Sequence, residues 1–328
     1  MAELVDAGDS KSPAARCAGS SPASGTIASV VVLVLLSLAD VALVNLMKII
    51  HIIMAVLVPL IWGAGFVVAK GTINEFPPIL LMAFRFLVTS LLLVWFVKPP
   101  IGSLRALFLI AIVASAIQYS LTFTGLKGLD AGFASLIVQL EVPFLVILSV
   151  VLLGEKTSAR KWIGIIIAFS GVGLLVGKVE FGNAWLSVIL VVLGAFTWAI
   201  GQILVRRLEN IDGLTLTAWI AIFATPQLFL MSFLFEKNQV DLVLNANMSV
   251  WWAVLYLGLV MTALGYYFWY TLIRTYQVEK VAPFLLLLPV FSLAGGVIFL
   301  GEALSFVKVI GGVVVILGVA FASIEKRS

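Results

Sequence analysis

Long apolar runs, separated by short polar turns, repeat along the chain from residue 50 onward. A bilayer core of roughly 30 Å is crossed by about 20 apolar residues in a helix, and the runs have that length. Turn residues such as Pro77-Pro78, Pro99-Pro100 and Gly301-Glu302 mark the boundaries. The pattern predicts an all-α membrane protein with ten transmembrane helices, near residues 50–70, 77–97, 105–125, 130–153, 160–177, 184–205, 214–235, 250–272, 281–300 and 304–323.

The composition excludes most other classes of protein. Apolar residues make up 62% of the 328 residues and charged residues only 11%, whereas a soluble domain is nearer half apolar and a quarter charged. The single cysteine, Cys17, and the single histidine, His51, argue against disulfides, metal sites and cofactors held by such ligands. The net charge of +4 comes from scattered loop residues, so nucleic acid is not an expected partner.

The Lys and Arg residues of the loops predict the orientation in the membrane, because cytoplasmic loops carry an excess of them. If the end near Met47 is inside, inner loops hold twelve such residues and outer loops five. We therefore expect a multi-pass protein of the cytoplasmic membrane with both termini in the cytoplasm.

Residues 1–46 do not fit this plan. Residues 1–26 are rich in Ser, Ala and Gly, and residues 27–46 are apolar but carry Asp40. A further span here would leave about three residues for the turn at Met47 and would place the N-terminus outside. Residues 1–16 and 19–26 also back-translate into conserved arm sequences of a tRNA gene. We interpret 1–46 as an atypical extension outside the native fold, and expect a chain that begins at Met47 to insert and function.

An internal repeat divides the rest of the chain into residues 47–178 and 179–328. A shift of 136 residues places Trp62-Gly63-Ala64-Gly65 on Trp198-Ala199-Ile200-Gly201, and a shift of 147 places Leu153-Gly154-Glu155 on Leu300-Gly301-Glu302. The second shift also aligns Tyr119 with Tyr266. Because each half has five predicted helices, the halves enter the membrane in opposite directions. Inverted repeats of this kind are typical of transporters that work by alternating access.

The same residues resemble the EamA branch of the drug/metabolite transporter superfamily, from about Met47 to Ile324, and most of all its exporters of O-acetylserine and cysteine. The similar segments are Trp62-Gly63, Phe76-Pro77-Pro78, Arg85-Phe86, the run 131–136, both Leu-Gly-Glu motifs, Tyr256-Leu257, Gly265-Tyr266 and Val281-Ala282-Pro283. The resemblance implies ten helices in two inverted five-helix repeats and efflux of amino acids or related metabolites coupled to protons. Glu141 departs from the resemblance, since amide or apolar residues are commoner there.

Two charges fall inside predicted helices, where they are costly and usually functional. Glu141 is a candidate for binding a proton or a substrate amine, and Arg85 for holding a carboxylate with two hydrogen bonds. The structural alternative is that these two residues pair with each other and lock the fold.

Proline and polar residues indicate where a substrate site would lie. Pro143 and Pro289 are equivalent to within one residue under the shift of 147, and interrupted helices at matching places point to a central site. The alternative is a kink that only serves packing. Ser135 and Gln139 share one helix face, as hydrogen-bonding groups for a polar solute or as contacts between helices.

Aromatic residues complete the set of candidates. Trp62 and Trp198 lie in mid-span beside small residues, which favours a role in lining or gating a cavity. The remaining candidates for the lining are Tyr119, Gln202 and Tyr266. The small residues Gly164, Ala168 and Gly171, with Gly311 and Gly318, indicate close helix packing.

Taken together, the sequence predicts an alternating-access exporter of small amino-acid-like metabolites that exchanges them for protons, with no catalytic residues and no metal. The lipid bilayer is its expected environment, and the sequence is compatible with a homodimer. One alternative is a carrier of sugar phosphates or nucleotide sugars, which would need more mid-span cations than Arg85. Another is a membrane assembly protein without transport. An enzyme is disfavoured because the spans lack a nucleophile with its base.

Overall fold

The computed structural model describes residues 47–154, 156–176, 183–208, 211–276 and 281–323. All regular secondary structure in these ranges is helical, and they contain no strand. The helices of the first half are α2 (Ile49–Thr72), α3 (Pro78–Leu93), α4 (Leu104–Ala111), α5 (Gln118–Lys127), α6 (Ala131–Val138), α7 (Glu141–Leu153) and α8 (Ala159–Val176).

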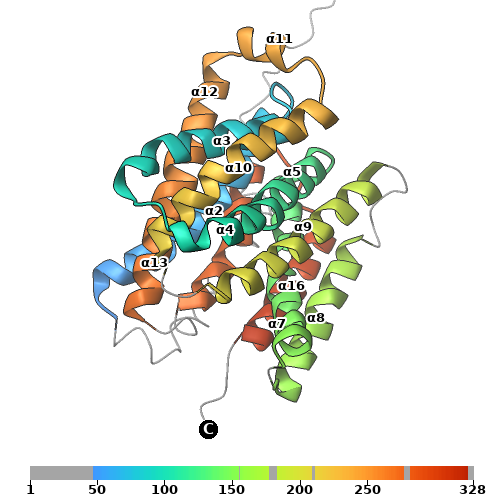
Figure 1. Ribbon diagram of the computed structural model, residues 1–328. Coiled ribbons are helices and arrows are strands. Elements are labelled where there is room, and N and C mark those ends of the chain that lie inside the picture. The colour runs from blue at the N-terminus through green and yellow to red at the C-terminus, as the bar shows by residue number, and fades with distance from the viewer. Residues whose placement is uncertain (1–46, 155, 177–182, 209–210, 277–280, 324–328) are drawn as a thin grey trace, which may run out of the picture.

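 The second half contributes α9 (Asn183–Arg206), α10 (Gly213–Phe235), α11 (Gln239–Leu244), α12 (Met248–Leu255), α13 (Gly265–Thr275), α15 (Leu288–Leu300) and α16 (Phe306–Ser323). Figure 1 shows these helices as one bundle, with α11 at one end.

Seven helical segments within the described ranges are long and apolar enough to cross a membrane, by length and composition. They are 49–72, 78–96, 101–127, 131–153, 184–206, 213–235 and 248–273, and two shorter apolar helices cover 284–300 and 306–322. The chain is therefore an α-helical, multi-pass membrane protein. Each of the ten predicted ranges contains helix, but ten membrane crossings stay a prediction.

Two helical segments, one of the seven long ones and one of the two shorter ones, are interrupted near a proline. The first breaks at Gln139 and Leu140, between α6 and α7, just before the buried Pro143. The second passes at Leu288 from the 3₁₀ segment η6 (Ala282–Leu287) into α15, next to the buried Pro289. Proline lacks the backbone N–H that a regular helix needs, which accounts for a break at both places.

Two other segments contain a π-helical stretch in the middle. The stretch η4 (Ile112–Ile117) joins α4 to α5, and η5 (Tyr256–Leu264) joins α12 to α13. A π-helix shifts the backbone hydrogen bonds by one residue, and such stretches are frequent at functional sites. They are not visible in the hydrophobic pattern of the sequence.

Helices α8 and α16 pack side by side through glycines (Figure 1). A Cβ atom on Gly164 would lie 2.7 Å from the carbonyl oxygen of Gly318, and one on Gly171 would lie 3.1 Å from that of Gly311. Only glycine allows the two backbones to approach this closely, which confirms the close packing predicted from these residues.

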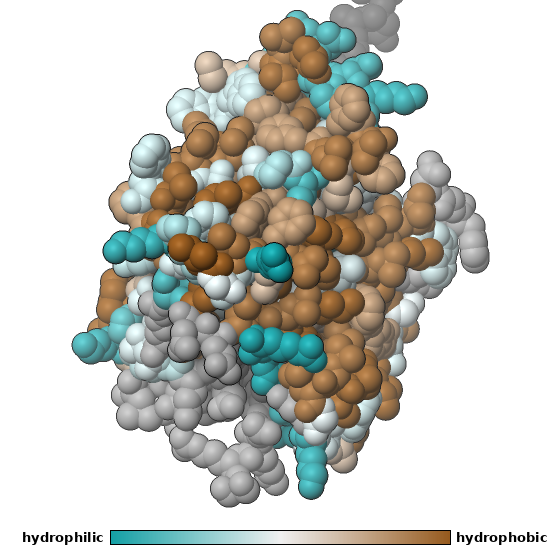
Figure 2. Space-filling view, viewed as in Figure 1, coloured by the Kyte–Doolittle hydropathy of each residue, from teal (hydrophilic) through white to brown (hydrophobic). Residues whose placement is uncertain are grey.

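The outer surface of the bundle is largely apolar. Figure 2 shows hydrophobic residues over most of the visible face, and Phe235, Ile166 and Phe299 are among the exposed large side chains. A soluble protein rarely exposes so much contiguous apolar area. Lipid is the medium that matches this surface. The predicted extension, residues 1–46, lies outside the described residues.

Candidate functional site

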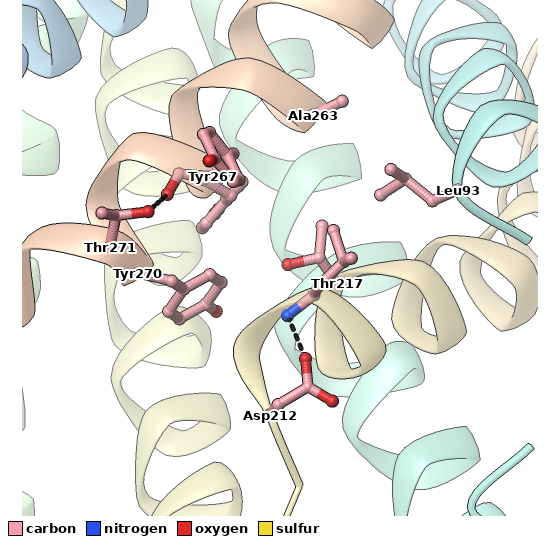
Figure 3. A pocket seen from close by; sticks show the side chains of 9 residues that line it. Leu93, Asp212, Thr217, Ala263, Tyr267, Tyr270 and Thr271 are labelled. Atoms are coloured by element: carbon pink, nitrogen blue, oxygen red, sulfur yellow. Dashed lines mark hydrogen bonds between the residues drawn. The ribbon is translucent and has the colours of Figure 1, made fainter. Parts of the chain in front are cut away.

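A pocket opens at the end of the bundle where α3 ends and α10 begins (Figure 3). Its volume is about 180 Å³, and its lining combines apolar side chains with hydroxyl groups and one carboxylate. The lining residues are Leu93, Asp212, Leu214, Thr217, Ala263, Tyr266, Tyr267, Tyr270 and Thr271. Concave sites with a few polar groups on apolar walls are typical of small-molecule binding.

Asp212 shapes the mouth of this pocket. Its Oδ1 accepts hydrogen bonds from the backbone N–H groups of Leu214 (3.0 Å) and Thr215 (3.1 Å), which caps the N-terminus of α10. The cap satisfies amides that have no partner inside the helix. Tyr270 faces the same space and interacts with the hydroxyl of Thr217.

Arg85 on α3 lies deeper in the bundle and is 1% exposed. Its Nε donates a hydrogen bond of 2.7 Å to Thr262 Oγ1, and its Nη2 lies 3.4 Å from the Tyr119 hydroxyl. The guanidinium carbon lies 4.6 Å from the centre of the Tyr119 ring, a cation–π contact. Within the described part of the chain, no carboxylate forms an ion pair with Arg85.

Tyrosine side chains join Arg85 to the pocket. Tyr119 interacts with Tyr266 through their hydroxyl groups, and Tyr266 also lines the pocket. The ring of Tyr266 lies 5.3 Å from that of Trp62 and 5.8 Å from that of Tyr270, measured between centroids. Trp62, Arg85, Tyr119 and Tyr266, predicted separately, therefore form one cluster, which we call the aromatic–arginine cluster.

The π-helical stretch η5 positions this cluster. Within η5 the carbonyl oxygen of Met261 accepts a hydrogen bond of 3.1 Å from Trp62 Nε1, and that of Gly258 accepts one of 2.9 Å from Thr89. Thr262 donates to the carbonyl of Leu257, five residues earlier, while accepting from Arg85. The altered backbone hydrogen bonding thus offers carbonyl groups to side chains of other helices.

A second group of predicted residues lies at the helix breaks. Ser135 is fully buried and donates to the carbonyl of Gly132 in its own helix. Gln139 Nε2 lies 3.4 Å from the carbonyl oxygen of Leu285 and so connects the break after α6 with η6. Pro143 and Pro289 stand one or two residues inside the helices that follow. Of these residues, Gln139 makes the contact between the two breaks.

Glu141 is the first residue of α7 and is partly buried. Among the residues that the structure describes, none forms a hydrogen bond or ion pair with its carboxylate, and Arg85 does not pair with it. The side chains of Trp198 and Gln202 on α9 are also partly buried, and Trp198 packs beside the cluster of Leu148, Ala199 and Ile203. Neither residue belongs to the aromatic–arginine cluster.

The sequence analysis missed the polar residues that bind Arg85 and the pocket wall. Thr262 looks like any threonine in an apolar run, and nothing in the pattern marks the π-helical stretch that presents it. Asp212 is the N-cap of α10 and Thr217 lies within this helix, and neither was among the predicted site residues. Asp212 followed by Gly213 and Thr215 does carry a helix N-cap signal, which is the sign that was available.

Comparison with known proteins identifies the family to which this fold belongs. Residues 49–177 and 185–324 each match the EamA-like transporter family. The chain belongs to that family. The matched residues cover both halves, and they include the pocket, the aromatic–arginine cluster and the two helix breaks.

Two similar relatives are named probable amino-acid metabolite efflux pumps. One, from Escherichia coli, is 29% identical over 81% of this chain and 92% of its own length. The other, from Salmonella typhimurium, is 31% identical with the same coverage. A solved crystal structure has a TM-score of 0.60 at 20% identity, over 84% of this chain and 97% of that one, which shows a shared fold.

Proposed function

We propose that this EamA-family protein exports small amino-acid-like metabolites across the cytoplasmic membrane in exchange for protons, by alternating access between residues 47–178 and 179–328. The relatives named as efflux pumps support the direction and the substrate class. The substrate would enter through the pocket and contact the aromatic–arginine cluster.

Matching features of the two halves support the inverted repeat. Under the shift of 147, α8 corresponds to α16, and both α7 and α15 have 13 residues and end at a left-handed glycine, Gly154 or Gly301. The same shift places Gly164 on Gly311 and Gly171 on Gly318, so the two glycine contacts between α8 and α16 are equivalent to each other. It also places Tyr119 on Tyr266, and these two residues contact each other. Residues that meet their own equivalents lie near a two-fold axis, as inverted repeats require.

The observation that carries the substrate class is Arg85. A guanidinium that is 1% exposed and has only neutral described partners has lost its hydration without gaining an opposite charge. A substrate carboxylate would supply that charge with two parallel hydrogen bonds. The rings of Trp62 and Tyr266 would pack on the rest of a small amino acid.

Glu141 is the proposed proton site. It is the partly buried carboxylate at the break between α6 and α7, and has no described hydrogen-bond partner. A carboxylate without a fixed partner is free to bind a proton in one state and to lose it in the other. Arg85 and Glu141 would then handle the substrate and the proton separately.

Transport into proteoliposomes of the Arg85→Lys and Arg85→Gln variants tests the carboxylate site. Lys keeps the charge but not the paired geometry, so we expect apparent affinity to fall about 10- to 100-fold, in line with a lost charge-assisted hydrogen bond. Gln should abolish measurable transport. Arg105→Gln, at an exposed position on α4, is the matched control and should transport normally.

The substrate panel uses O-acetylserine, cysteine and their decarboxylated analogues. The proposal expects competition by the carboxylates and none by the decarboxylated compounds. Equal competition by both, or full transport by correctly folded Arg85→Lys protein, would show that Arg85 does not bind a carboxylate.

A further inference from the structure

Two carboxylates from the second half bind helix N-termini of the first half, at the end of the bundle opposite the pocket. Glu236, directly after α10, accepts hydrogen bonds from the backbone N–H groups of Ile79 (2.8 Å) and Leu80 (2.9 Å) at the start of α3. Its Oε2 also accepts a hydrogen bond of 2.7 Å from Ser232. The carboxylate therefore caps a helix to which it is not connected.

Glu302 makes the corresponding contact with α6. Its Oε1 accepts a hydrogen bond of 2.6 Å from the N–H of Ala131, and its Oε2 lies 3.5 Å from the nitrogen of Gly132. The left-handed Gly301 turns the chain after α15, and the N–H of Glu302 bonds back to the carbonyl of Gly296. The carboxylate lies directly over Gly296, where a Cβ atom would collide with it.

Neither α3 nor α6 has a capping side chain of its own. Pro77 at the start of α3 has no hydrogen-bonding side chain, and Asp130 at the start of α6 does not cap it. Asp130 pairs with Lys308 on α16 instead. Since the first amides of a helix need partners, the second half supplies both caps.

Basic residues surround the two caps. Lys70 on α2 donates to the carbonyl oxygens of Leu126 and Lys127 at the end of α5, and its charge acts on Glu302 and Asp130. The charge of Lys127 acts on Glu236, and that of Lys308 acts on Glu302. Every one of these groups lies at the end that the loop charges predict to be outside.

We propose that Glu236 and Glu302 are the latches of an outer gate, which hold α3 and α6 against the second half while the pocket is open to the other side. The proposal rests on the alternating-access function and adds the residues that close its outer mouth. When the halves separate, the two carboxylates leave the helix N-termini and enter water. The contacts are therefore made in one state and lost in the other.

This arrangement makes the gate sensitive to external pH. Burial raises the pKa of both carboxyl groups above the ordinary value of 4.5, against the lowering effects of their hydrogen bonds and of Lys127 and Lys308. Asp130 adds to the rise at Glu302. In an open mouth the carboxyls face water, so the closed gate binds protons more tightly. External acid then favours closure, and this stabilisation is lost as pH rises through the closed-state pKa.

A buried reporter cysteine tests the gate without any transport assay. In a Cys17→Ser background, Ser292→Cys places a thiol on α15 at a position that is 0% exposed. The full chain is reconstituted in proteoliposomes, and a membrane-impermeant maleimide is added to the side on which Ser249→Cys reacts. Ser249 is exposed in the first turn of α12, and its labelling rate corrects for the pH dependence of the thiol.

Loss of one latch should speed labelling of the reporter about fivefold, the effect of losing a typical helix cap. Glu236→Ala and Glu302→Ala each test this, with Glu236→Leu and Glu302→Leu, which keep the size but accept no hydrogen bond, used if an alanine variant does not fold. Asp241→Ala is the matched control, because Asp241 is an exposed carboxylate on α11 at the same end and makes no described side-chain contact with the first half. It should label at the parent rate.

Acidifying the outer solution should slow labelling of the parent reporter, after correction, and the double latch variant should lose this dependence. Folded latch variants that label at the parent rate with an unchanged pH dependence would overturn the proposal. Failure to export amino acids would leave these rates unaffected, so the latch and the proposed function fail separately.

Discussion

Arg85 and Glu141 are both charged residues inside helical segments, yet their surroundings differ. Arg85 is buried against Thr262 and the ring of Tyr119, whereas no described residue bonds to the Glu141 carboxylate. The alternative that the two residues pair with each other is not what the structure shows within its described ranges. A fixed guanidinium suits binding, and a carboxylate without a fixed partner suits proton exchange.

Glu141→Gln separates proton coupling from substrate movement. Gln keeps the size and hydrogen-bonding capacity of Glu but does not titrate. We expect exchange of labelled substrate across the membrane to continue, while accumulation driven by an imposed pH gradient collapses. Proteoliposomes of the variant and of the parent are compared for both activities. Equal accumulation by the variant would place the coupling at another residue.

At the scale of elements, irregular helix geometry positions the functional groups. The π-helical stretch η5 offers carbonyls to Trp62 and Thr89, and the breaks before α7 and α15 bring Gln139 to Leu285. Regular packing elsewhere provides the frame. Helices α8 and α16 are the clearest example, because their backbones touch at glycines.

Gly318→Ala should destabilise the protein by about 1 to 3 kcal/mol, the usual cost of overpacking. The added Cβ would lie 2.3 Å from the backbone nitrogen of Ala168, which has no room to move away. Gly173→Ala is the matched control on α8, since a Cβ there meets nothing within 4 Å. It should be neutral or slightly stabilising. Thermal unfolding of the purified variants in detergent measures both. A normal unfolding temperature for Gly318→Ala would show that the α8–α16 contact is loose.

At the scale of the whole molecule, the two ends of the bundle are different. One end holds the pocket, bordered by Asp212 and Tyr270, and the other holds the carboxylate caps of Glu236 and Glu302. On the proposed mechanism of alternating access, a molecule open at the pocket end and latched at the other would be one of the two required states.

The orientation of these ends in the membrane can be tested by labelling. Two exposed serines, one at each end, are replaced by cysteine. In the Cys17→Ser background, Ser249→Cys should react with an impermeant maleimide added to intact cells. Ser158→Cys, exposed before α8 at the pocket end, should react only after the membrane is permeabilised. The opposite result would mean that the pocket faces outward, and would reverse the sides assigned to the latches.

The sequence by itself determined that this is an α-helical membrane protein and where along the chain its helices lie. Apolar runs of membrane length needed only hydropathy to be read, and each predicted range contains helix. The repeated motifs led to the family, which the matches at residues 49–177 and 185–324 confirm. The breaks near Pro143 and Pro289 were also predictable, because proline removes a helix hydrogen bond wherever it stands.

Only the tertiary structure decided which residues meet. It brought Trp62, Arg85, Tyr119 and Tyr266 together and left Trp198 in a separate cluster. It also turned Glu236 and Glu302 from loop residues into caps for helices far away in the chain. Hydropathy reports whether a residue prefers lipid or water, but it carries no information on which helix faces which. Those contacts depend on crossing angles, on glycine approaches and on the backbone shift of a π-helix, which become defined only when the helices pack.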